Sequence, residues 1–283
     1  MNKLANKLFG IVPPVVTPFL DDNSVDQDST YKLMDYLIKG GIHSLFILGT
    51  TGEGPLTPIE TQREFVKVVS NYVKKVPILV GVSDISTIKV INNINKIANF
   101  NIDGIVSTLP MYYSTDKDEQ LQHFKSIADS SPVPLILYDI PQRVGTKIMP
   151  SVVMELANHS NIAGLKDSSG NLRNFRSIVE RLGDDREFTL LLGDSSMIDI
   201  SVLIGADGVV PSDAHFYPEL CVMIYELAKK GKWEEARKQQ RKLNFERQEI
   251  YNKYPNIANI GCKISKKYLK EKMIISSEKS LRL

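Results

Sequence analysis

Residues 162–170 have the sequence IAGLKDSSG, an apolar run that ends in a lysine and leads into a helix start at Asn171-Leu172. The run does not alternate between polar and apolar residues, which predicts a strand buried on both faces. A lysine at the end of such a strand is unusual, because a buried ammonium costs free energy unless it is paired or neutral. The simpler interpretation is an amine that extends to the surface at a strand end. The choice between a buried and an exposed amine depends on the rest of the sequence.

Similar short apolar runs occur along the whole chain, with helical patterns between them. The predicted strands cover 11–17, 44–48, 77–81, 104–109, 135–138, 162–166, 189–193 and 208–211. Helices are expected to start at Thr57-Pro58-Ile59-Glu60, which has the pattern of a capping box, at Ser86 and near Pro218. Eight strands that each precede a helix predict an α/β fold, a (β/α)8 TIM barrel. A doubly wound open sheet is the rival, but its usual GxGxxG or GxxxxGK[ST] phosphate loop is missing.

The C-terminal part of the sequence predicts helices beyond the barrel. Residues 233–251 and 257–270 have helical patterns, so we expect a catalytic barrel over 1–230 and a helical extension over 231–283. The basic excess of this part is expected on a solvated helix face, formed by Lys263, Lys266, Lys267, Lys270 and Lys272.

Composition excludes several classes of function. The 283 residues carry 35 Lys and Arg against 33 Asp and Glu, a net charge of +2, so no strong field attracts nucleic acid or an acidic membrane. The two cysteines and four histidines lack metal-binding spacing, so neither a metal ion nor a cofactor is expected. The sequence MNKLANKLFG at the N-terminus lacks the apolar run of a signal peptide, and a reduced, cytoplasmic protein is expected.

In a barrel of this kind, the carboxyl ends of the strands carry the active site. Lys166 would then lie at the mouth, where desolvation lowers the pKa of its amine and lets it attack a carbonyl to form a Schiff base. The sequence GTTGEG at 49–54 follows another strand and suits a carboxylate, through exposed backbone N–H groups and threonine hydroxyls. Tyr138 could move protons. Each feature alone also fits a purely structural role: GTTGEG as a tight turn, and Tyr138 as an aromatic residue of the barrel core.

Together these segments resemble a known family. GTTGEGPLTPIE (49–60), YDIPQRVG (138–145), GLKDSSGN (164–171) and GADGVV (205–210) occur in the order and spacing of the dihydrodipicolinate synthase and N-acetylneuraminate lyase superfamily, the pyruvate-dependent class I aldolases. The similarity extends from about residue 9 to about residue 272.

The resemblance implies a role for each matching residue. Lys166 matches the Schiff-base lysine, Tyr138 the general acid and base, and Thr50 the threonine that relays its protons. Thr51 matches the residue that holds the pyruvate carboxylate. Val210 matches a residue whose carbonyl faces pyruvate.

Two further positions depend on the resemblance. Gly193, in the sequence GDSS, lies where the family binds substrate. Tyr112 matches a tyrosine that a neighbouring subunit donates to complete the relay, with Tyr113 as the adjacent alternative and Met111 in place of the usual aromatic. A homo-oligomer, a dimer of dimers, is therefore implied.

Members of the superfamily differ in the aldehyde that reacts with pyruvate. Arg143 matches the arginine that binds the carboxylate of aspartate semialdehyde in synthases, which favours 4-hydroxy-tetrahydrodipicolinate synthase, an enzyme of lysine and diaminopimelate biosynthesis. The Asp-Ser-Ser after Lys166 and the sequence GEGP keep an alternative open, an aldolase of 2-keto-3-deoxy-sugar acids, 4-hydroxy-2-oxo acids or N-acetylneuraminate. A barrel that binds a keto acid without catalysis is a third hypothesis, although a binder has no need of a reactive amine.

Overall fold

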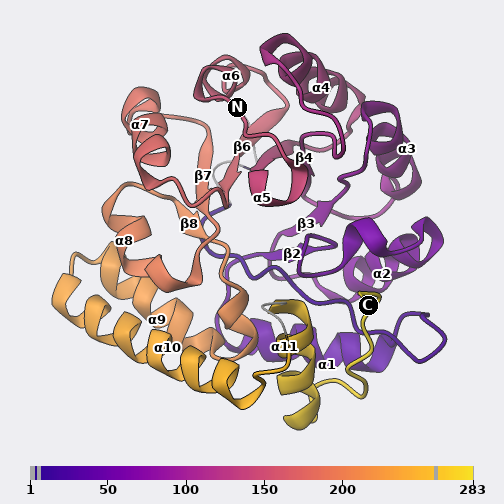
Figure 1. Cartoon of the computed structure of the whole chain (residues 1–283), viewed down its shortest axis with the longest axis vertical. Coiled ribbons are helices and arrows are strands. Elements are labelled where there is room, and N and C mark those ends of the chain that lie inside the picture. The colour runs from indigo at the N-terminus through magenta and orange to yellow at the C-terminus, as the bar shows by residue number, and fades with distance from the viewer. Residues whose placement is uncertain (1–3, 5–7, 258–260, 283) are drawn as a thin grey trace.

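Eight parallel strands form the centre of the molecule (Figure 1). The structure is a computed structural model that describes residues 4, 8–257 and 261–282. Hydrogen-bonded neighbours follow the order β1-β8-β7-β6-β5-β4-β3-β2. The strands are β1 (Gly10–Ile11), β2 (Leu45–Ile47), β3 (Ile78–Gly81), β4 (Gly104–Thr108), β5 (Leu135–Asp139), β6 (Ile162–Asp167), β7 (Thr189–Leu192) and β8 (Gly208–Val209).

Backbone hydrogen bonds between the segments of β1 and β2 close the sheet into a barrel. The N–H of Val15 donates to the carbonyl of Phe46 over 2.8 Å, and the N–H of Phe46 donates to the carbonyl of Pro13 over 3.0 Å. The predicted strand at 11–17 is shorter in the structure because Pro13 and Pro14 have no N–H to donate to a ladder. The fold prediction is confirmed: the chain is a TIM barrel with additional C-terminal helices.

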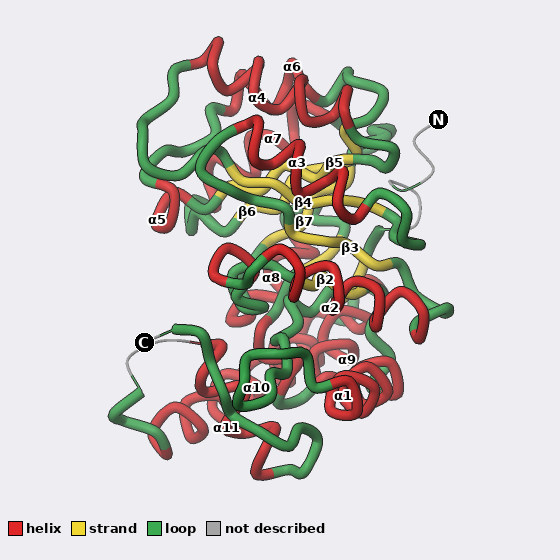
Figure 2. Tube along the Cα trace, turned by 90° about the vertical axis from the view of Figure 1, so that its right-hand side faces the viewer, coloured by secondary structure: helices red, strands yellow, loops and turns green. Residues whose placement is uncertain are grey.

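Helices surround the barrel on its outer face, and a second layer lies along one side of it (Figure 2). Among the described helices, none is long and apolar enough to cross a membrane. The helices are α1 (Gln27–Lys39), α2 (Ile59–Tyr72), α3 (Thr87–Ile97), α4 (Lys117–Ser130), α5 (Pro141–Val144), α6 (Pro150–Leu156), α7 (Leu172–Leu182), α8 (Ile198–Leu203), α9 (Pro218–Lys229), α10 (Trp233–Lys253) and α11 (Gly261–Glu271).

The predicted helix starts are correct at two positions and wrong in detail at the third. Ser86 caps α3 by accepting from the N–H of Lys89, and α9 begins at Pro218. The capping box at Thr57 is wrong, because α2 begins at Ile59 without a side-chain cap. The Thr57 hydroxyl donates instead to the carbonyl of Glu53, 2.9 Å away, and so fastens the loop that follows β2.

The C-terminal helices pack on the barrel, as Figure 1 shows at its lower edge. Helix α10 packs against α8 and α9, and α11 packs near residues 212–215 after β8. The interpretation of the basic C-terminal residues as a solvated face is wrong for Lys266, which is fully buried and paired with the equally buried carboxylate of Glu53. The reason is that Glu53, in the loop after β2, lies against the buried side of α11 and pairs with Lys266 there. The division at residue 230 stays a prediction.

We expect the Glu53–Lys266 pair to be a large determinant of stability. Lys266→Met leaves the Glu53 carboxylate buried without its countercharge, and breaking a buried pair in this way costs roughly 3–5 kcal/mol. Urea unfolding followed by circular dichroism measures the change. The matched control is Glu53→Gln with Lys266→Met, which removes both charges and should be less destabilised than Lys266→Met alone. Loss of less than about 1 kcal/mol, the scale of a surface pair, in Lys266→Met contradicts this prediction.

Candidate active site

Lys166 and Tyr138 lie side by side inside the barrel. They are paired in register on the neighbouring strands β6 and β5, and both are buried, with 5% of Lys166 exposed. The amine of Lys166 lies 3.7 Å from the centroid of the Tyr138 ring and 4.7 Å from that of Phe46. The amine therefore does not extend to the surface, and the simpler interpretation of this lysine is wrong.

Burial changes the titration of this pair. Desolvation lowers the pKa of Lys166, although the neighbouring Tyr138 opposes the change. Burial by itself would raise the pKa of Tyr138, but the charge of Lys166 and hydrogen bonds from Thr50, Lys166 and Ser168 outweigh it and lower the pKa of the phenol. The two groups interact and titrate as a unit. An amine that loses its proton more easily than usual, next to a phenol that does the same, can attack a carbonyl and move protons.

The loop after β2 brings Thr50 to this pair. Its hydroxyl lies 3.4 Å from the Tyr138 hydroxyl, within hydrogen-bond distance, and either oxygen can donate. The glycines of this loop serve packing: a Cβ at Gly54 would lie 1.9 Å from the carbonyl oxygen of Leu48. The Thr17 hydroxyl donates to the carbonyl of Gly52 over 2.7 Å. The position of Thr50 is thus fixed by backbone contacts on both sides of its loop.

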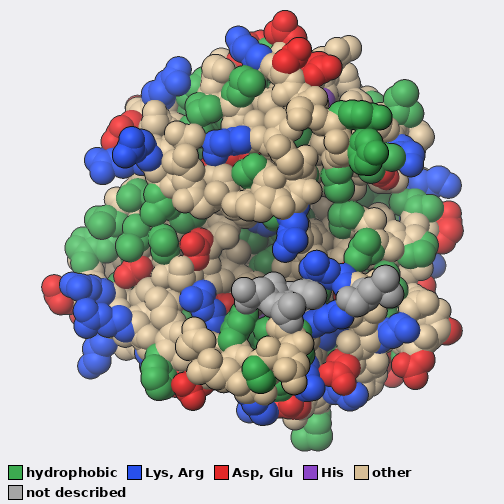
Figure 3. All heavy atoms as spheres, viewed as in Figure 1, with side chains coloured by type: hydrophobic (Ala, Val, Ile, Leu, Met, Phe, Trp, Pro, Cys, Tyr) green, Lys and Arg blue, Asp and Glu red, His purple; other side chains and the backbone are tan. Residues whose placement is uncertain are grey.

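Tyr138 lines a cavity of about 240 Å³. Its walls are mainly apolar, and the polar groups on them include the Thr50 and Tyr138 hydroxyls and the Arg143 guanidinium. The space-filling view shows a hollow at the centre of this face with Lys or Arg side chains in it (Figure 3). A pocket with an apolar wall and a few convergent polar groups is typical of a small-molecule site.

Asp139, at the end of β5, holds together the two ends of the segment 140–148, which contains Arg143. Its buried carboxylate accepts from the N–H of Ile148 and from the amine of Lys147, both over 3.0 Å. Burial raises the pKa of Asp139, whereas these two bonds oppose the rise. Arg143 itself is exposed on α5, and Gly145 ends that helix with a φ of 80°, which suits glycine.

The other predicted site residues, like Lys166 itself, are not among the residues that line the cavity. Val210 belongs to the same apolar cluster as Tyr138, inside the barrel. Gly193 donates its N–H to the carbonyl of Asp167 over 2.7 Å. Thr51 is half-buried beside Thr50.

Tyr112 is not among the residues that line the cavity. It is 85% exposed, and its ring contacts that of Tyr113 edge-on at 4.9 Å. Its φ of 98° is a strained value for a residue with a side chain. Met111, next to it, does line the cavity.

Two residues of the site were not predicted from the sequence. Glu53 lines the cavity within the quoted GTTGEG motif, yet it was given no role there. Arg282 lines the same cavity from the far end of the chain, and no local pattern marks it. Within the described ranges, no group of three or more His, Cys, Asp or Glu side chains is arranged to hold a metal ion.

Comparison with known proteins identifies the family. The model of the Dihydrodipicolinate synthetase family matches residues 7–272. A 4-hydroxy-tetrahydrodipicolinate synthase of Methanosphaerula palustris is 32% identical over 233 residues, 80% of this chain and 78% of that protein. The dihydrodipicolinate synthase of Bacteroides thetaiotaomicron is 33% identical with a TM-score of 0.90, over 96% of this chain and 91% of that one. A 2-keto 3-deoxygluconate aldolase from Picrophilus torridus is 28% identical with a TM-score of 0.83, over 94% of each chain. The chain therefore belongs to the dihydrodipicolinate synthetase family of enzymes.

Proposed function

We propose that this enzyme condenses pyruvate with an aldehyde through a Schiff base on Lys166, and that the aldehyde is aspartate semialdehyde. The observation that carries the proposal is the buried Lys166 amine, 3.7 Å from the ring of Tyr138, which itself lines a cavity together with Arg143. Family membership and the similarity to named synthases support it. The activity would be that of a 4-hydroxy-tetrahydrodipicolinate synthase, in lysine and diaminopimelate biosynthesis in the cytoplasm.

The proposed chemistry uses the buried Lys166 amine together with the neighbouring cavity that Tyr138 and Thr50 line. The neutral Lys166 amine attacks the keto carbon of pyruvate, and water leaves as the Schiff base forms. Loss of a methyl proton gives an enamine, whose carbon attacks the aldehyde. Tyr138 delivers and accepts the protons, and Thr50 connects its hydroxyl to the cavity. Thr51, Gly193 and the carbonyl of Val210 are proposed to hold the pyruvate end.

Arg143 favours a carboxylate on the aldehyde. A guanidinium binds a carboxylate through two parallel hydrogen bonds, a geometry that a hydroxyl does not match. Cleavage of a 2-keto-3-deoxy-sugar acid is the second candidate, supported by the similarity to the Picrophilus torridus aldolase. That reaction would use the same Lys166 and Tyr138, since it also passes through the pyruvyl enamine.

We also propose that the working form is a homo-oligomer, a dimer of dimers. Tyr112 is strained and exposed in one subunit, and a neighbouring subunit could use it to complete the proton relay. Tyr113 is the adjacent alternative.

The Schiff base is tested by trapping. Pyruvate with borohydride should add one pyruvyl mass to the peptide that contains Lys166, and Lys166→Ala should show no adduct by mass spectrometry. Because burial lowers the pKa of Lys166, the neutral amine and the adduct should form at a lower pH than for an ordinary lysine.

The matched control for trapping is Tyr138→Phe, which keeps the ring over the amine. It should still form some adduct, while kcat falls about 100-fold or more because the proton donor is lost. Labelling of a lysine other than Lys166 would overturn the mechanism.

The role of Tyr112 is tested by mixing two inactive proteins. Tyr112→Phe supplies an intact Lys166 and Lys166→Ala supplies an intact Tyr112, so mixed dimers should contain one complete site. Activity should reappear after subunit exchange, and Tyr113→Phe in place of Tyr112→Phe distinguishes the two tyrosines. Full activity in a monomer verified by sedimentation rules out the shared site.

The aldehyde is tested at Arg143. Arg143→Ala should raise the KM for aspartate semialdehyde about 10- to 100-fold, because a charge-assisted bidentate contact contributes roughly 1.5–3 kcal/mol. Adduct formation with pyruvate should change little. Arg143→Lys, which keeps the charge without the planar fork, should recover only part of the loss. If the wild-type protein cleaves 2-keto-3-deoxygluconate and does not use aspartate semialdehyde, the second candidate is correct.

A further inference from the structure

The segment after α11 returns to the mouth of the barrel. Ser276 bonds to the N-terminal cap of α1: its N–H donates to the Ser29 hydroxyl over 2.9 Å, and its own hydroxyl donates to the Asp26 carboxylate. Ile275 is buried beside this contact. The carbonyl of Lys279 then accepts from the buried Lys266 amine over 2.7 Å. Residues 276–282, called the tail below, are thus fastened at two separate places.

Glu53 fixes the end of the tail. One oxygen of its carboxylate pairs with Lys266. The other accepts three bonds from the tail: the Ser280 hydroxyl and the Leu281 N–H over 2.7 Å each, and the Arg282 N–H over 3.3 Å. Glu53 is 1% exposed, so these bonds are shielded from water. The backbone of Arg282 is therefore held beside the loop that carries the catalytic threonine.

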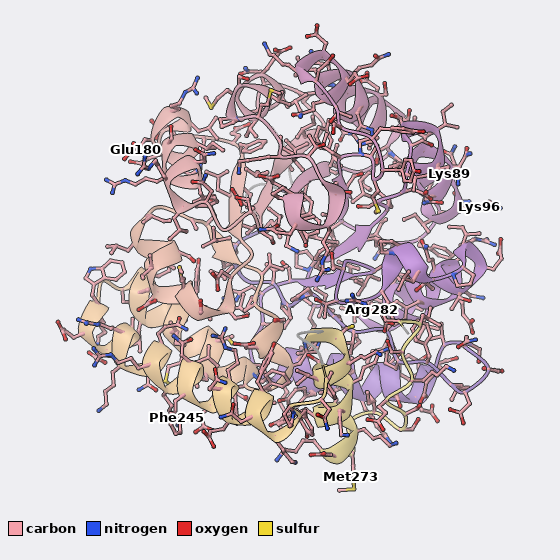
Figure 4. The ribbon with its side chains drawn as sticks, in the orientation of Figure 1. Lys89, Lys96, Glu180, Phe245, Met273 and Arg282 are labelled. Atoms are coloured by element: carbon pink, nitrogen blue, oxygen red, sulfur yellow. The ribbon has the colours of Figure 1, made fainter. Side chains whose placement is uncertain are left out.

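Arg282 consequently borders the substrate cavity. It lines the same cavity as Arg143, Thr50 and Tyr138. Figure 4 shows Arg282 at the inner edge of the tail, near the mouth, whereas Lys89, Lys96, Glu180 and Phe245 lie at the periphery.

The charge of Arg282 has no acid to balance it in the part of the chain that the structure describes. Neither Arg282 nor Arg143 forms an ion pair there, and the one carboxylate on the cavity wall, Glu53, is already paired with Lys266. Burial raises the pKa of the Cys262 thiol, and the adjacent Arg282 opposes this rise. A neutral thiol is a weak acceptor and leaves the guanidinium charge available.

We propose that Arg282 is a specificity-determining residue, which together with Arg143 binds an oxyanion at the end of the second substrate remote from its aldehyde. This inference rests on the proposed function. Two guanidinium groups on a largely apolar cavity wall favour a carboxylate or a phosphate and disfavour a neutral polyol. The tail thereby supplies a substrate contact that no strand end of the barrel provides.

The experiment compares three aldehydes with pyruvate as the partner: aspartate semialdehyde, glyceraldehyde 3-phosphate and glyceraldehyde. Arg282→Met removes the guanidinium and keeps the backbone bond to Glu53, so the fold should be preserved. The KM for at least one anionic aldehyde should rise about 10- to 100-fold, whereas the KM for glyceraldehyde and for pyruvate should stay within twofold. The anionic aldehyde that is affected identifies the group bound. Arg176→Ala is the matched control, since Arg176 is exposed on α7 and pairs with Glu180 on the same helix.

A binding measurement tests the role of Arg282 without requiring that the enzyme turn over any of these aldehydes. After borohydride has trapped pyruvate on Lys166, succinate or glycerol 3-phosphate is titrated into wild-type and Arg282→Met protein by calorimetry. A tenfold or greater loss of affinity for either anion supports the proposal. Equal affinities, or an equal change in KM for anionic and neutral aldehydes, overturn it. Failure of wild-type protein to trap pyruvate would instead overturn the proposed function.

Discussion

The burial of Lys266 against Glu53 is the constraint on which the organisation of the site depends. A buried carboxylate is stable only if both of its oxygens have partners, because each unpaired polar atom costs desolvation free energy. Here Lys266 satisfies one oxygen and the tail satisfies the other. Since Glu53 belongs to the loop after β2, the same carboxylate joins that loop to α11 and to the tail. The position of Thr50 and that of Arg282 are set by a common anchor.

The barrel contains a second buried lysine whose surroundings are opposite in character. Lys166 has no carboxylate within ion-pair distance among the described residues, and aromatic rings surround its amine. Desolvation lowers the pKa of the Lys166 amine, and Tyr138 opposes the change. Desolvation also lowers the pKa of Lys266, but there the opposing group is the Glu53 carboxylate. The two buried amines thus differ in their partners, a carboxylate for Lys266 and a phenol for Lys166. The partners differ because Lys166 on β6 lies next to Tyr138 on β5, whereas Lys266 on α11 faces Glu53 in the loop after β2.

Local pattern was enough to predict the strands, because these depend on short segments, and it also pointed to the candidate site. The apolar runs and the rule that barrel sites lie at strand ends pointed to Lys166, Tyr138 and the GTTGEG loop, and the family resemblance singled out Thr50 within that loop. Arg282 could not be found in this way, since its place in the cavity results from hydrogen bonds to Glu53 far away in the sequence. Thr57 was misassigned because the Thr-x-x-Glu pattern does not show which group the threonine hydroxyl bonds. In the structure this hydroxyl donates to the backbone carbonyl of Glu53 and does not cap α2.

The distance along the chain between Glu53 and its partners affects when these contacts can form during folding. Lys266 and Arg282 follow Glu53 by 213 and 229 residues. Contacts of such separation form late, since a long loop must close before they can contribute. During synthesis the strands emerge from the ribosome well before these partners do. We therefore expect a nascent chain to form much of its barrel before the contacts that hold Arg282 at the cavity can form.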